Sequence, residues 1–100
     1  MKILALEKEV EGIRDEQFTP ALLKNEAMRA WGLHQQGIIR ELYFRQDRYE
    51  AVLMLECSTV DEARSVLSTL PLVRAGLIAF DIVPLIPYDG FKRLFANEMT

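Results

Sequence analysis

The stretch Gly37–Cys57 constrains the fold more than any other part of this 100-residue chain. Its first half, Ile38–Arg45, alternates between two faces, and its second half, Tyr49–Cys57, is rich in Val, Leu and Met on both faces. The short polar turn Gln46-Asp47-Arg48 separates them. Because period-2 alternation broken by a polar turn is typical of a hairpin, the stretch predicts two antiparallel strands, the second of them central in a sheet.

Two helices flank this hairpin in the sequence. The first, Pro20–Gln36, is predicted from Thr19 as its N-cap and from Gly37, a residue type that commonly follows a helix end. The second follows a capping box that begins at Thr59, and it is expected to end at Pro71. The first helix has an apolar arc that is expected to pack on the sheet, and this arc holds Leu22, Leu23, Ala27, Ala30, Trp31 and Leu33.

Two further strands complete the expected elements. They are Ile3–Leu6, extended loosely to Val10, and Leu77–Leu85. The order strand, helix, strand, strand, helix, strand predicts an α+β, ferredoxin-like βαββαβ domain over residues 1–100. Its four-stranded antiparallel sheet would carry both helices on one face.

The opposite face of that sheet is expected to be apolar, with Ile39, Tyr43, Val52, Met54 and Val83 on it. This area is too large to leave in water. A second copy that packs sheet against sheet, as a dimeric α+β barrel, would cover it, and so would a lipophilic ligand trapped between two sheets. The tail, with Tyr88 and Phe91–Phe95, could cover the cavity or clasp a partner subunit. The clasp is favoured, because three apolar residues on a free tail need cover.

Composition excludes several classes of protein. A net charge of −3 argues against a nucleic-acid surface, which is normally basic. The single cysteine, Cys57, excludes an intramolecular disulfide, and the single histidine, His34, excludes a multi-histidine metal site within one chain, so no metal is expected. The apolar run near the N-terminus is too short for a signal peptide or a membrane span, which predicts a cytoplasmic protein.

The central part of the chain resembles the muconolactone isomerase family of the dimeric α+β barrel superfamily. The likeness covers roughly 22–87, and its most specific pieces are Gln36-Gly37, the Arg40-x-Leu42-aromatic motif and Leu67–Leu72. The resemblance implies isomerisation of a small lactone by proton transfer without a cofactor, and assembly into homo-oligomers. The superfamily also includes cofactorless monooxygenases and binding proteins without known chemistry, so both remain alternatives.

The resemblance also implies roles for individual residues. Glu26 stands where the family has a glutamate in the first helix, and Tyr43 stands where it has an aromatic residue. Glu41 replaces an expected histidine, and Leu23 replaces a lysine near the start of that helix.

Glu26 is the candidate base, because an apolar surrounding raises the pKa of a carboxyl toward the range that proton abstraction needs. The alternative is a glutamate at the edge of the arc that pairs with Arg29 or a strand arginine. Tyr43 is the candidate proton donor. Glu41, Arg45 and Asp81 would orient the substrate, or they would belong to a dimer interface.

His34 falls within the apolar arc one turn from the helix end. It could act as a general base or a substrate contact or, as another possibility, a haem ligand, and the alternative is a packed, hydrogen-bonded core residue. Together these residues predict a homo-oligomer with a small-molecule cavity between sheet and helix. The expected activity is cofactor-independent proton transfer on a small oxygenated molecule, and the alternative from another class is a non-catalytic binding or assembly module.

Overall fold

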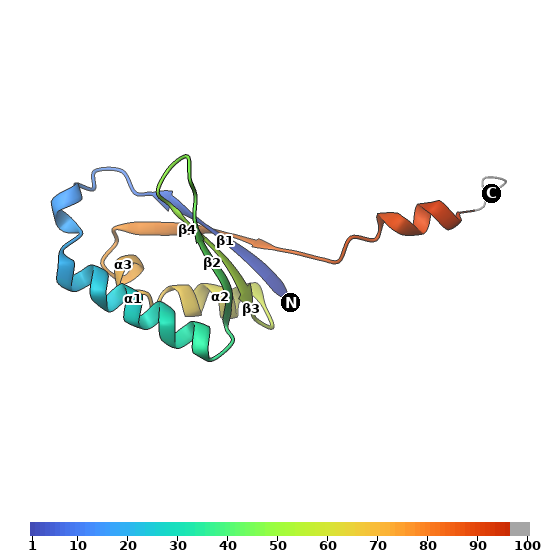
Figure 1. Ribbon diagram of the computed structural model, residues 1–100, viewed down its shortest axis with the longest axis horizontal. Coiled ribbons are helices and arrows are strands. Elements are labelled where there is room, and N and C mark those ends of the chain that lie inside the picture. Colours follow the sequence, from blue (N-terminus) through green and yellow to red (C-terminus); the bar gives the residue numbers. More distant parts are fainter. Residues whose placement is uncertain (97–100) are drawn as a thin grey trace.

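The computed structural model describes residues 1–96. Its four strands form one sheet in the order β2-β3-β1-β4, with antiparallel neighbours throughout, and they are β1 (Lys2–Glu9), β2 (Ile39–Phe44), β3 (Ala51–Glu56) and β4 (Ile78–Pro84). One face of the sheet is covered by three helices, α1 (Pro20–Gln35), α2 (Val60–Leu67) and α3 (Pro71–Arg74) (Figure 1). Two 3₁₀ helices, η1 and η2, span Asp15–Gln17 and Gly90–Phe95. The predicted ferredoxin-like α+β fold is confirmed. Within residues 1–96 no helix combines the length and apolar character that a membrane span requires.

The helix ends follow local capping chemistry. The Thr19 hydroxyl accepts a hydrogen bond from the backbone N–H of Leu22 at 3.2 Å, and α1 ends before Gly37, whose φ of +77° suits glycine. Thr59 caps α2 in the same way. The second helix ends earlier than predicted, at Leu67, and Pro71 begins the separate short helix α3. This agrees with the preference of proline for the first position of a helix.

The core lies between the sheet and the α2 side of the helical layer. Its fully buried residues come from β1, β2, β3, α1 and the segment around α2, and they include Ile3, Ala5, Ile39, Leu55, Leu33, Ala63 and Leu70. Helix α1 contributes one buried residue to this core, Leu33. The expectation that the arc of α1 packs closely on the sheet is therefore wrong for Leu23 and Trp31, which are 45% and 61% exposed. Much of α1 stands away from the sheet.

A β-bulge in β2 corrects the predicted alternation of that strand. Ile39 pairs with Leu55, but Glu41 pairs with the next residue of β3, Met54, so Arg40 is the extra residue. The bulge places Ile39 in the core, where it is 0% exposed, and its expected position on the uncovered face is wrong. The strand register confirms the other residues predicted on the uncovered face, which are Tyr43, Val52, Met54 and Val83.

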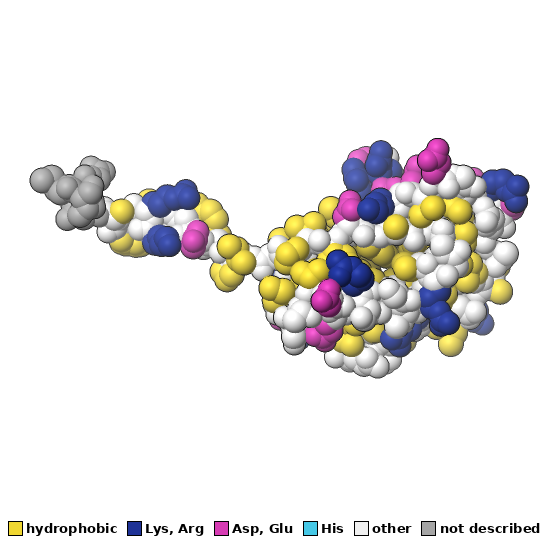
Figure 2. All heavy atoms as spheres, turned by 180° about the vertical axis from the view of Figure 1, so that it is seen from behind, with side chains coloured by type: hydrophobic (Ala, Val, Ile, Leu, Met, Phe, Trp, Pro, Cys, Tyr) yellow, Lys and Arg dark blue, Asp and Glu magenta, His cyan; other side chains and the backbone are white. Residues whose placement is uncertain are grey.

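The chain leaves β4 and extends away from the domain as a tail that ends in η2 (Figures 1 and 2). The longest dimension is 63 Å and the radius of gyration is 17.2 Å, compared with about 13 Å for a compact chain of this length. The apolar tail residues are 67–86% exposed, and they include Phe91, Leu94 and Phe95. Figure 2 shows apolar and basic side chains along this tail.

Candidate functional site

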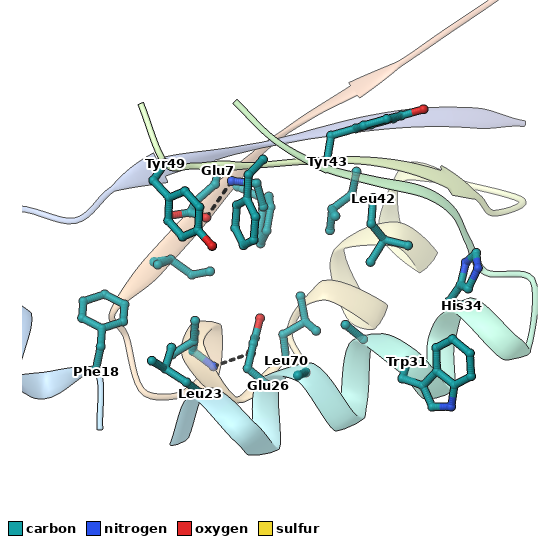
Figure 3. Close-up of a pocket in the computed structure, with 18 residues that line it drawn as sticks. Glu7, Phe18, Leu23, Glu26, Trp31, His34, Leu42, Tyr43, Tyr49 and Leu70 are labelled. Carbon is teal, nitrogen blue, oxygen red and sulfur yellow. Dashed lines mark hydrogen bonds between the residues drawn. The ribbon is translucent and has the colours of Figure 1, made fainter. Parts of the chain in front are cut away.

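A cavity of about 700 Å³ lies between α1 and the helix-facing side of the sheet. It runs from Phe18 and Leu23 at one end to Trp31 and His34 at the other (Figure 3). This size falls within the range of small-molecule sites. Most of its wall is apolar, contributed by Phe18, Leu23, Ala27, Ala30, Trp31, Leu42, Phe44, Ala51, Leu53, Leu70, Leu72, Ile78 and Phe80.

The cavity lies beneath the middle of α1, because the helix contacts the rest of the domain mainly at its two ends, through Leu22 near its start and Leu33 near its end. Leu33 anchors the C-terminal end in the core, whereas Leu23, Ala27 and Trp31 face the hollow. Apolar side chains that would otherwise pack on the sheet thus become the wall of a site. The apolar arc predicted from the sequence is present in α1, but much of it lines a cavity instead of packing on the sheet.

Glu26 projects from α1 into this cavity (Figure 3). Its Oε1 accepts a hydrogen bond from the backbone N–H of Leu72 at 2.9 Å. Burial raises the pKa of Glu26 above its usual value, the Leu72 hydrogen bond opposes this, and the negative charge of Glu7 adds to the increase in pKa. Arg29 instead donates to the hydroxyl of Thr69 at 2.9 Å. Within residues 1–96, the alternative in which Glu26 pairs with Arg29 or a strand arginine is therefore not formed.

Glu7 projects into the same cavity from β1, on the opposite wall (Figure 3). Its Oε1 accepts a hydrogen bond from the backbone N–H of Ala51 at 2.9 Å. Burial raises the pKa of Glu7, the Ala51 hydrogen bond opposes this, and nearby Glu50 raises the pKa further. Two half-buried carboxyl groups with raised pKa values therefore share one apolar cavity.

Glu7 was missed as a site residue, although the sequence carried a signal for it. Ile3, Ala5 and Glu7 lie at alternating positions of β1, and the first two are fully buried. Period 2 places the third on the same face. A carboxyl at an inward position of a central strand requires either a partner or a cavity.

Aromatic side chains frame both ends of the cavity. Phe44 and Tyr49 stack with ring centroids 4.1 Å apart and an interplanar angle of 20°, where the β2–β3 hairpin turns. At the other end the rings of Trp31 and His34 are 6.0 Å apart. His34 is exposed rather than packed in the core, and its Nδ1 lies 2.8 Å from the carbonyl oxygen of Ile39.

Of the other candidate residues, His34 and Tyr43 line this cavity with Glu26, whereas Glu41, Arg45 and Asp81 do not. Tyr43 borders it, but its hydroxyl points away from it and donates to Glu41 at 2.8 Å (Figure 3). Glu41 and Tyr43 pair with Met54 and Val52, on the sheet face without helices.

Arg45 and Asp81 are likewise engaged elsewhere. Arg45 makes two hydrogen bonds to the carboxylate of Asp47, at 2.9 and 2.6 Å. Asp81 accepts from Lys8 at 2.8 Å on the face without helices. One cavity within one chain therefore does not bring Glu26 together with Glu41, Arg45 and Asp81. Among residues 1–96, no three His, Cys, Asp or Glu side chains are grouped as a metal site would require.

Structural comparison identifies the fold. A crystal structure of muconolactone isomerase matches the chain with a TM-score of 0.69 and 17% sequence identity, over 89% of this chain and 92% of that one. The chain has the fold of muconolactone isomerase. No protein-family model matches the sequence, and no curated protein does.

A second structural neighbour is 5-chloro-2-hydroxyhydroquinone dehydrochlorinase from Burkholderia phenoliruptrix AC1100, in complex with 2,5-dihydroxybenzoquinone. It matches with a TM-score of 0.63 and 19% identity, over 90% of this chain and 98% of that one. At these identities the likeness establishes the fold, and the resemblance read from the sequence is confirmed at that level.

Proposed function

We propose that this protein catalyses cofactor-independent proton transfer on a small oxygenated ring compound bound between α1 and the sheet. The observation that carries the proposal is the placement of Glu26, whose carboxyl reaches an apolar cavity while Oε1 is held by the Leu72 N–H. No hydrogen bond within residues 1–96 engages its Oε2. A base that abstracts a proton next to a carbonyl needs this combination of fixed position and raised pKa.

Glu7 and Glu26 take complementary roles in this reaction. Glu26, in its ionised form, removes a proton from the carbon next to the carbonyl. Glu7, in its protonated form on the opposite wall, donates a hydrogen bond to the oxygen that becomes negatively charged. For isomerisation, the proton held by Glu26 then returns to a different carbon of the delocalised enolate, which shifts the double bond and leaves both carboxyl groups as they began.

The comparisons support a ring-sized oxygenated substrate. One neighbour is named as an isomerase of a lactone, and the other as a dehydrochlorinase in complex with a quinone. Both names describe chemistry on small oxygenated rings. Because fold alone does not fix a reaction, the two carboxyl groups carry the assignment here.

We further propose that the working form is a homodimer or a larger homo-oligomer. The sheet face without helices carries Tyr43 and Val83, which are 59% and 38% exposed, beside Leu4, Val52 and Met54. The tail extends beyond its own domain with apolar side chains in water. A second copy fits both features, because it offers a like apolar face and a surface within reach of the tail.

The test of the catalytic proposal uses α-angelica lactone, an uncharged five-membered enol lactone, in deuterated buffer. NMR should show deuterium entering the ring, and the double bond shifting into conjugation, faster with protein than with buffer alone. Glu26→Gln should reduce this rate at least about 100-fold, the range of general acid–base effects. Glu11→Gln, an exposed carboxyl outside the cavity, is the matched control and should match the unaltered protein.

Equal exchange rates for the unaltered protein and Glu26→Gln would show that Glu26 is not the base. Binding of the lactone without any exchange would instead support the non-catalytic binding module. Loss of exchange in Glu11→Gln as well would point to a general effect of charge.

A further inference from the structure

We propose that the cavity selects ring compounds without a negative charge and rejects carboxylates. The inference rests on the site of the proposed function, but it concerns which molecules enter rather than what happens to them. Its basis is the charge of the wall. Glu7 and Glu26 are the acidic side chains that line the cavity, and within residues 1–96 no Lys or Arg lines it.

An anion that entered would lose hydration without gaining a counter-charge. Desolvation of a carboxylate is costly unless a cation or several donors replace the water. The backbone N–H groups of Ala51 and Leu72 already donate to Glu7 and Glu26. An anion in the cavity thus meets apolar walls, the ionised Glu26 and a few polar side chains, among them Glu7, His34 and Tyr49, but within residues 1–96 no Lys or Arg.

The neighbouring hollow strengthens this charge preference. A second hollow of about 390 Å³ shares Glu7, Phe18 and Tyr49 with the cavity. Its own wall adds three carboxyl groups, from Glu9, Asp15 and Glu50. Acidic side chains therefore lie beside this end of the cavity, and their charge opposes the binding of a negatively charged ligand.

The cations nearest in sequence pair with carboxylates, and one of these carboxylates, Glu50, lies in the wall of the second hollow. Arg14 lies 3.1 Å from the carboxylate of Glu16, and Arg48 lies 3.6 Å from Glu50. Neither arginine lines the cavity or its neighbour. On α1, Leu23 is at the rim where a longer basic side chain would reach the cavity.

The experiment uses three phenols that carry a two-carbon substituent at the same ring position and differ in its charge. They are 4-(2-hydroxyethyl)phenol, 4-(2-aminoethyl)phenol and 4-hydroxyphenylacetate, which are neutral, cationic and anionic at pH 7. Calorimetry or ligand-observed NMR on the full chain gives their dissociation constants. The alcohol and the amine should each bind at least about tenfold more tightly than the acid, as expected for a site without a counter-charge.

Two variants test the cause of the selectivity. The double variant Glu7→Gln/Glu26→Gln removes both acidic groups. It should narrow the difference in affinity between the amine and the acid, because the attraction of the one and the repulsion of the other are lost, while the acid still binds more weakly than the alcohol because it finds no cation. Leu23→Lys places a cation at the rim and should strengthen binding of the acid at least about tenfold while the alcohol changes little. Leu23→Met is the matched control, and it should leave the ratio between the ligands unchanged.

Binding of the acid as tightly as the alcohol by the unaltered protein would overturn the inference, and so would failure of all three phenols to bind. An unchanged ratio in Leu23→Lys would overturn it even if the double variant does not fold. These outcomes are independent of turnover. Weaker binding of the acid without proton exchange would support this inference and contradict the proposed function. Proton exchange together with equal binding of the acid and the alcohol would support the proposed function and contradict this inference.

Discussion

Replacing Glu26 with Gln should increase the free energy of unfolding at neutral pH. Burial raises the pKa of this carboxyl in the folded state above its ordinary value of 4.5. The folded protein therefore holds the proton more tightly than the unfolded chain. The contribution of Glu26 to stability is fully present below pH 4.5 and is lost as the pH rises through the folded pKa.

The magnitude follows from the contacts of the side chain. Each unit by which the pKa is raised corresponds to about 1.4 kcal/mol, and half-burial keeps the net effect to a modest part of total stability. The amide introduced by Glu26→Gln retains an oxygen for the Leu72 N–H, so that hydrogen bond survives. Glu26→Ala removes the acceptor, and because Leu72 is buried its unpaired N–H costs about 1–3 kcal/mol relative to Glu26→Gln.

Urea unfolding followed by circular dichroism, at pH 4 and pH 7 and at one protein concentration, measures these differences. At pH 4, Glu26→Gln and the unaltered protein should have nearly the same free energy of unfolding. At pH 7, the free energy of unfolding of Glu26→Gln should be the higher of the two. A variant less stable than the unaltered protein at pH 7 would refute this reasoning, since that is the result expected from a lost ion pair. An equal difference between the two proteins at both pH values would show that ionisation of Glu26 is not the cause.

Further predictions concern the assembly and the anchor of α1. Light scattering should give at least twice the chain mass of 11.5 kDa, and a monomer at micromolar concentration would contradict the sheet-to-sheet dimer. Truncation after Tyr88 should weaken self-association by up to about 1.5–3 kcal/mol for each apolar side chain that a partner fully buries, and an unchanged dissociation constant would mean that the tail binds no partner. Leu33→Ala should lower the free energy of unfolding by about 2–5 kcal/mol in urea titration, because the residue is 1% exposed, whereas Met28→Ala, at a 63% exposed position of the same helix, should change it little.

Local chemistry explains why the elements could be predicted. Thr19, Thr59 and Gly37 act through capping bonds and backbone dihedral angles within a few residues, so their effects are encoded nearby in the chain. The order of the elements, together with an apolar β3, was then sufficient for the ferredoxin-like arrangement. Glu26 could be predicted as a candidate site residue for the same reason, because helical periodicity places its carboxyl on the apolar side of α1.

The site itself required the tertiary structure. The bulge at Arg40 reverses which face Ile39 occupies, and a single extra residue leaves no periodic signal before the strands pair. The gap beneath α1 arises because Leu22 and Leu33 pack on the core near the two ends of the helix, whereas Leu23, Ala27 and Trp31 between them line a cavity. Glu7 and Glu26 are distant in sequence, and only the packing of β1 against α1 across that gap brings their carboxyl groups to one cavity. The sequence alone determined which residues can be buried, whereas the spacing between the layers decided which of them line a site.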